Sequence, residues 1–133
     1  MNHIRNGRKV KSIKVKLIIL LIGIVIFFFS LTGYIVYWTF FDINRIPKQL
    51  MIEEKTSPNG TYTVKAYLSD MGATTSYSIV AELIFNKENR KAKNIYFKNK
   101  QNSVEINWID NDTVEINGIE LDVPYEVYDY RWQ

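Results

Sequence analysis

The sequence LIILLIGIVIFFFSLTGYIVYWTFF, residues 17–41, contains no charged residue and decides how the rest of the chain is organised. As an α-helix this segment is about 37 Å long, and the hydrocarbon core of a bilayer is about 30 Å thick. Tyr34, Tyr37 and Trp38 lie near its C-terminal end, and such amphipathic rings favour the headgroup region of a membrane. The segment therefore predicts a transmembrane helix over residues 17–41.

Two other interpretations of this segment fit less well. A cleaved signal peptide has an apolar stretch of only about 7 to 15 residues, followed by a small-residue cleavage site. This stretch is longer, and no such site follows it. A core helix of a soluble protein would carry polar positions along one face, and residues 17–41 carry none of this kind. We therefore interpret the segment as an uncleaved signal anchor of a single-pass membrane protein.

The charge distribution predicts the orientation of this helix. Residues 1–16 contain no acidic residue and six of the 17 lysines and arginines, namely Arg5, Arg8, Lys9, Lys11, Lys14 and Lys16. Because cations beside a membrane helix favour the cytoplasmic side, residues 1–16 are expected to be a basic cytoplasmic tail. The C-terminal part is then extracytoplasmic. It is mildly acidic, since residues 17–133 hold the other eleven cations and all 14 acidic residues, so it offers no electrostatic footprint for nucleic acid.

Beyond residue 41 the sequence predicts a linker and a β-domain. Residues 42–49 form the linker, in which Pro47 prevents a helix from continuing. In residues 50–133 apolar and polar residues alternate with a period of two, as in antiparallel strands with one buried face. The expected fold is a single transmembrane α-helix followed by a small all-β domain, an antiparallel sheet or sandwich of about six or seven strands. The residues expected on the buried face are Tyr62, Val64, Ala66 and Leu68; Tyr77, Ile79, Ala81, Leu83 and Phe85; Ile95 and Phe97; Val104, Ile106 and Trp108; Val114 and Ile116; and Ile119, Leu121 and Val123.

Turn residues separate these alternating runs. Ser57-Pro58-Asn59-Gly60 and Asn117-Gly118 predict hairpins, because Asn-Gly accepts the positive φ that tight turns need. Further connections are expected at residues 110–112, 86–91 and 69–76. The aromatic and acidic residues 124–133 are expected to pack across an open end of the sheet. Since all the runs follow Pro47, the β-domain is expected to fold without the helix.

Three stretches carry a resemblance to a known family. They are SPNGTYTVKAYLSDMGATTSYSIVAEL (57–83), KNIYF (93–97) and VEINWIDNDTVEINGIELDVPYE (104–126). Together they resemble a family of small uncharacterised membrane-anchored proteins of Gram-positive bacteria, a domain of unknown function. The resemblance covers roughly residues 50–130, and it implies the same layout of an N-terminal helix and an outer β-domain. It implies no activity and no functional residue.

The residue types argue against catalysis in the β-domain. The chain has no cysteine, and its one histidine, His3, lies in the basic tail. The commonest general bases and nucleophiles are thus missing, so we expect no enzyme and name no catalytic, cofactor-binding or metal-binding residue. Asp110, Asp112 and Glu115 surround one turn and could hold Ca²⁺, but the glycine of an EF-hand loop is missing and aspartate is an ordinary turn residue. Whether this turn binds a cation stays open.

These observations favour a membrane-tethered, extracytoplasmic binding or interaction module of the cell envelope. The first alternative is an accessory subunit recruited to a membrane partner through its helix. The second is a hydrolase that uses only carboxylates, for example the pair Asp110 and Glu126. The expected partners are the lipid bilayer and another membrane or envelope protein, without nucleic acid and without a cofactor. A basic stretch has two interpretations, contact with anionic lipid or wall polymer, or an edge strand protected by lysines; it comprises Lys87, Arg90, Lys91, Lys93, Lys98 and Lys100.

Overall fold

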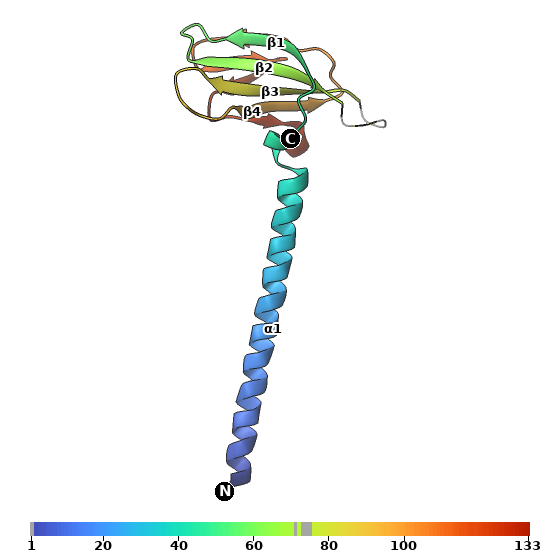
Figure 1. The fold of residues 1–133 in the computed structure, drawn as a ribbon, viewed down its shortest axis with the longest axis vertical. Helices are drawn as coiled ribbons and strands as arrows, with labels where there is room; N and C mark the ends of the chain where they lie inside the picture. Colours follow the sequence, from blue (N-terminus) through green and yellow to red (C-terminus); the bar gives the residue numbers. More distant parts are fainter. Residues whose placement is uncertain (1, 71, 73–75) are drawn as a thin grey trace. The chain divides into compact units, whose positions relative to one another are not determined.

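A computed structural model of the chain describes residues 2–70, 72 and 76–133. The chain divides into two units, Met1–Asp42 and Ile43–Gln133. The first unit is one helix and the second is a β-domain (Figure 1).

Helix α1 (Asn2–Phe40) is longer than the predicted transmembrane segment because the helix also includes the basic tail. No proline interrupts residues 2–40, and the hydrogen bonds of an α-helix are local, so the lysine-rich segment continues the same helix. The large apolar side chains from Val10 to Phe40 are between 42% and 76% exposed. Over Asn6–Phe40 the helix is long and apolar enough to cross a membrane, judged by its length and composition.

The β-domain contains two sheets (Figure 1). In the five-stranded sheet the order is β1-β2-β3-β4-β8, with β1 (Leu50–Thr56), β2 (Tyr62–Ser69), β3 (Ser78–Phe85), β4 (Lys93–Asn99) and β8 (Tyr128–Asp129). In the three-stranded sheet the order is β5-β6-β7, with β5 (Ile106–Trp108), β6 (Thr113–Ile116) and β7 (Ile119–Asp122). Strands β1 to β4 pair in antiparallel fashion, as do β5 to β7, whereas β8 pairs with β4 in parallel. The predicted all-β class is confirmed. The eighth strand comes from the C-terminal segment, which was expected only to pack across the sheet.

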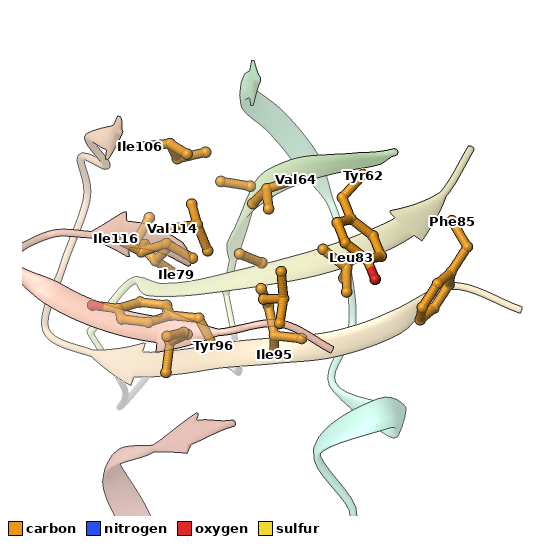
Figure 2. Packing of buried hydrophobic residues seen from close by; sticks show 14 residues of the cluster. Tyr62, Val64, Ile79, Leu83, Phe85, Ile95, Tyr96, Ile106, Val114 and Ile116 are labelled. Carbon is orange, nitrogen blue, oxygen red and sulfur yellow. The ribbon is translucent and has the colours of Figure 1, made fainter. Parts of the chain in front are cut away.

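The main core lies between the two sheets. Figure 2 shows side chains of the large sheet, such as Val64 and Ile79, directed toward Val114 and Ile116 of the small sheet. All four of these side chains are fully buried. The predicted period of two is therefore confirmed in β2, β3 and β6. Fourteen buried residues form this cluster: Tyr62, Val64, Ala66, Ile79, Ala81, Leu83, Phe85, Ile95, Tyr96, Ile106, Val114, Ile116, Leu121 and Val123.

One face assignment in β4 is wrong. Ile95 and Phe97 were expected on the same face, but Phe97 packs in a second cluster on the opposite face of the large sheet. The cause is an irregularity in the β3–β4 pairing, where Ala81 pairs with Tyr96 while the next residue, Glu82, pairs with Asn94. Ile95 is left as the extra residue of a β-bulge, so Ile95 and Tyr96 both enter the main core.

Two aromatic residues expected to be buried are exposed in whole or in part. Tyr77 precedes β3 and is 53% exposed. Trp108 is half-buried, and its Nε1 donates a hydrogen bond to the carbonyl oxygen of Lys55 at 3.1 Å. Trp108 ends β5, and this bond links it to the edge strand β1 of the other sheet. The indole therefore joins the rims of the two sheets, and only part of it reaches the core.

The predicted turns are present where the structure describes them. The φ angles of Gly60, Asn117 and Gly118 are +73°, +49° and +80°, which confirms both Asn-Gly hairpins. The connection from Phe85 to β4 is polar and exposed, as expected for residues 86–91. The predicted connection 69–76 lies in part outside the described residues, and its first residue, Ser69, is the last of β2.

The segment predicted as a linker packs on the second face of the large sheet. After a short 3-10 helix, η1 (Ile43–Arg45), the side chain of Ile46 is 6% exposed and forms a cluster with Val80 and Phe97. The side-chain amide of Asn94 donates to the carbonyl oxygen of Ile43 at 2.8 Å. The β-domain therefore begins at Ile43, before Pro47.

Candidate functional site

The acidic turn between β5 and β6 is held together by its own hydrogen bonds. Oδ1 of Asp110 accepts from the backbone N–H groups of Asp112 at 2.8 Å and Thr113 at 2.7 Å. Oδ2 accepts from the hydroxyl of Thr113 at 3.2 Å. These bonds, the one from Asp112 first, hold the pKa of Asp110 below its ordinary value. Asp110 therefore stabilises the turn. Among the described residues, no three histidine, cysteine, aspartate or glutamate side chains lie so that they could hold a metal ion together.

Glu126, the other carboxylate of the hydrolase alternative, also serves the backbone. Its Oε2 accepts from the N–H of Asp122, the last residue of β7, at 2.8 Å. Asp110 and Glu126 thus each stabilise the end of a strand in the small sheet. Neither carboxylate is buried.

A buried polar cluster that the sequence pattern missed lies on the second face of the large sheet. Glu82 of β3 is 8% exposed, and it accepts a hydrogen bond from the hydroxyl of Tyr67 at 2.7 Å and forms an ion pair with Lys48. Burial, together with the hydrogen bond to Glu82, raises the pKa of Tyr67 to about 12. Each of these polar groups has its partner inside the cluster, so the cluster fastens the segment before β1 to the sheet.

Three cations of the basic stretch make contacts within the β-domain. Lys87 and Lys93 donate to the carbonyl oxygens of Asn59 and Pro124, at 3.0 and 2.6 Å. The guanidinium group of Arg90 lies 4.2 Å from the centroid of the Phe85 ring. The expectation of a lysine-protected edge strand is wrong for β4, because β4 lies between β3 and β8.

Lys100, the last residue of the basic stretch, lines a pocket. This pocket has a volume of about 310 Å³ and is lined by Ser76, Tyr77, Lys100, Gln101 and Asn102. Every one of these side chains carries a hydrogen-bond donor, and none is a carboxylate. Within the described part of the domain, this cluster of polar groups combines an open volume with hydrogen-bond donors and has no carboxylate in its lining. We therefore take it as the candidate site.

Gln101 is held in place from three directions. Its backbone N–H donates to the carbonyl oxygen of Tyr77 at 3.1 Å, which extends the pairing between β3 and β4. Its side-chain Oε1 accepts from the hydroxyl of Tyr96 at 2.8 Å and from the amide of Asn117 at 3.1 Å. Because two donors occupy Oε1, the amide nitrogen Nε2 is the atom of this side chain that remains to meet a ligand.

Asn117 fixes which end of the Gln101 amide is the oxygen. Oδ1 of Asn117 accepts from the N–H of Glu105 at 2.7 Å, and its Nδ2 donates to the carbonyl oxygen of Ser103 at 3.1 Å. A backbone N–H can only donate and a backbone carbonyl can only accept, so the orientation of this amide is determined. The nitrogen of Asn117 therefore faces Gln101, which must present its oxygen.

Two further features make this wall of the pocket rigid. Tyr96 is fully buried, and burial raises the pKa of its phenol above the ordinary value, so the hydroxyl keeps its proton and remains a donor to Gln101. Lys100 has a φ of +56°, a left-handed conformation that is uncommon for residues other than glycine. Such conformations persist only where the surroundings impose them, and they cluster at functional sites.

Sequence reasoning named Lys100 only as one member of a basic stretch, and Asn117 only as a turn residue. It did not single out Gln101 or Asn102. Local patterns carry no sign of this site, because the contact between Gln101 and Asn117 joins residues 16 positions apart. The unusual φ of Lys100 was equally hidden, because neither glycine nor asparagine occupies that position.

Residues 14–133 match the sequence model of a family of unknown function, DUF5412, and the chain belongs to this family. The expected resemblance to a domain of unknown function is thus confirmed, and its extent is greater than the predicted 50–130. No curated protein and no solved structure matches the chain.

Proposed function

We propose that this member of the DUF5412 family is a membrane-tethered binding module whose β-domain lies outside the cytoplasm. The observation that carries the proposal is the apolar surface of α1. Its large apolar side chains from Val10 onward are all at least 42% exposed. Soluble monomers rarely expose contiguous apolar patches larger than a few hundred Å². A bilayer would remove this surface from water, and a helix satisfies its backbone hydrogen bonds internally, as a membrane span requires.

The orientation is supported by the asymmetry of charge along α1. Five of the six cations of the tail, from Arg8 to Lys16, lie in the last turns before the uncharged run. The opposite end carries Tyr34, Tyr37 and Trp38, which suit a membrane–water interface. With the cationic end in the cytoplasm, the β-domain follows on the outer side.

A binding role, rather than catalysis, is supported by the chemistry of the β-domain. Residues 43–133 contain no histidine and no cysteine. Asp110 and Glu126 accept hydrogen bonds from the backbone, and Glu82 accepts one from Tyr67. The candidate pocket, in contrast, offers neutral donors and one ammonium group on a rigid polar support. Such a surface recognises a ligand without needing to transfer a proton.

Cysteine labelling on intact cells tests the orientation, since the chain has no thiol of its own. Asn89→Cys, at an exposed position between β3 and β4, should react with a membrane-impermeant maleimide, and Asn6→Cys in the tail should not. After the cells are lysed, both variants should react to the same extent. Labelling of position 6 but not of position 89 on intact cells would reverse the orientation, and release of the protein by alkaline carbonate would refute the membrane span.

The accessory-subunit alternative places the essential contact in the helix. Exchange of residues 17–41 for an unrelated transmembrane segment distinguishes binding by the β-domain from recruitment through the helix. If the β-domain carries the binding function, proteins or ligands captured in mild detergent should stay bound after the exchange. Their loss would instead favour recruitment through the helix.

A further inference from the structure

We propose that the pocket formed by Ser76, Tyr77, Lys100, Gln101 and Asn102 binds an acidic sugar, one sugar unit that carries a carboxylate. This inference rests on the proposed binding function, for which it names the site and the class of ligand. The argument has three steps, concerning the charge, the shape and the rigidity of the pocket.

The charge of the pocket selects an anion. Among the lining residues that the structure describes, Lys100 carries the one positive charge, and no side chain is acidic. The side chain of Lys100 is exposed, and its left-handed backbone is set by the turn after β4. A carboxylate bound here would form a charge-assisted hydrogen bond with the ammonium group, which is stronger than a bond between neutral groups.

The rest of the lining suits the body of a sugar. Pockets for small molecules range from about 300 to 1,000 Å³, so a volume of about 310 Å³ fits one small ring. Tyr77 is 53% exposed and supplies an aromatic surface against which the C–H face of a sugar can pack. Ser76, Gln101 and Asn102 supply a hydroxyl and two amides, which can both donate to and accept from hydroxyl groups.

The network behind the pocket makes the donor of Gln101 available before any ligand arrives. Its Oε1 is occupied by Tyr96 and Asn117, at 2.8 and 3.1 Å, so Nε2 does not have to break a bond with those two partners in order to bind. A side chain that is already ordered loses little conformational entropy on binding, and such preorganisation increases affinity. The network therefore holds one donor of the pocket in place before binding.

A titration of the full chain tests this inference. The detergent should have an oligo-oxyethylene headgroup, because sugar or charged headgroups would compete for the pocket. Glucuronate should shift the backbone amide signals of Tyr77, Gln101 and Asn102 in nitrogen–proton correlation spectra, with a dissociation constant in the millimolar range. Glucose lacks the carboxylate and should bind at least about tenfold more weakly, since a hydrogen bond to a charged group contributes about 1.5 kcal/mol or more. Acetate keeps the carboxylate but lacks the ring and its hydroxyl groups. It should also bind at least about tenfold more weakly, because it cannot pack on Tyr77 or bond to the amides of Gln101 and Asn102.

Two variants with matched controls identify the residues. Lys100→Asn removes the cation but tolerates the positive φ, and it should weaken glucuronate binding about tenfold. Lys91→Asn, at another exposed lysine, should leave the binding unchanged. Tyr77→Ala should weaken the binding, whereas Tyr125→Ala, at a tyrosine that is 82% exposed and outside the pocket, should not.

Several results would overturn the inference. If glucose bound as tightly as glucuronate, the ligand would not need a carboxylate. If acetate bound as tightly as glucuronate, the ligand would not need a sugar ring. Unshifted pocket amides, or equal affinity of Lys100→Asn and the parent, would refute the site. Because the titration does not depend on orientation in a membrane, it can fail while the labelling experiment succeeds, and the reverse is equally possible.

Discussion

At the residue scale, Glu82 shows how this domain accommodates a charge in a central strand. β3 has strands on both sides and residue clusters on both faces, and Glu82 is 8% exposed. An unpaired ion in such a place costs several kcal/mol. Lys48 and Tyr67 supply the compensating ion pair and hydrogen bond. These two interactions connect β2, β3 and the segment that precedes β1.

Tyr67→Phe should make the domain less sensitive to alkaline pH. The pKa of Tyr67 rises from the ordinary 10.0 to about 12 in the folded protein, through burial, the hydrogen bond to Glu82 and the negative charges of Glu82 and Glu54. The folded state therefore holds this proton more tightly than the unfolded chain does. This contribution to stability is complete below pH 10 and is lost as the pH rises from 10 toward 12.

Urea unfolding of the parent and of Tyr67→Phe, followed between about pH 9 and pH 11.5, measures this difference. The parent should lose more stability over this range than the variant, since phenylalanine cannot ionise. Tyr125→Phe, at a tyrosine that is 82% exposed, is the control and should follow the parent. Equal losses in the parent and in Tyr67→Phe would contradict the raised pKa.

At the element scale, the β6–β7 hairpin supports both the core and the pocket. Its strands pair Ile116 with Ile119, so two residues, Asn117 and Gly118, make the whole turn. Both have positive φ, as the type I′ turn of a two-residue hairpin requires. The side chain of Asn117 then reaches Gln101, Ser103 and Glu105. One turn thus sets the register of the small sheet and orients the support of the pocket.

Gly118→Val should destabilise the β-domain by about 1–3 kcal/mol. The φ of +80° is strained for a β-branched residue, and a Cβ at this position would meet nothing within 4 Å, so the cost comes from the backbone alone. Gly118→Asn is the matched control, because asparagine tolerates positive φ, and it should cost clearly less. Urea unfolding of the three proteins measures the difference. Equal stability of the valine and asparagine variants would show that the turn relaxes.

At the scale of the whole molecule, the boundary of the β-domain matters for its autonomy. The core between the sheets draws all its buried residues from Tyr62 onward. The second cluster, however, includes Ile46, and Asn44 accepts the backbone N–H of Asn94 at 3.0 Å. The segment that leaves the helix is therefore part of the folded domain from its first residues.

A fragment of residues 42–133 should be soluble, rich in β-structure and cooperatively folded. A shorter fragment, residues 49–133, loses Ile46 and leaves Glu82 without its ion-pair partner Lys48. We expect it to be less stable by several kcal/mol, since it exposes a buried side chain and breaks a largely buried ion pair. Circular dichroism during urea unfolding compares the two fragments. Equal stability would mean that the segment 43–48 contributes nothing to the fold.

Features that depend on near neighbours in the chain were determined by the sequence alone. The long apolar helix follows from hydrogen bonds four residues apart and from the uncharged run 17–41. The alternation in β2, β3 and β6 follows from the period of a strand, and the Asn117-Gly118 turn from the tolerance of these residues for positive φ. These constraints act within a few residues, so they can be read directly from the order of the amino acids.

Features that depend on pairing between distant segments were decided only by the tertiary structure. The bulge at Ile95 arises from the pairing of β4 with β3, and it moves Phe97 to the other face. Glu82 is buried because Lys48 and Tyr67 approach it from other segments. Gln101, which lines the pocket, has its amide oriented by Asn117, 16 residues away. Each of these contacts forms only when the sheets assemble, because its partners have no local preference for one another. The candidate site depends on such contacts as well, since it joins residues 76–77 to residues 100–102.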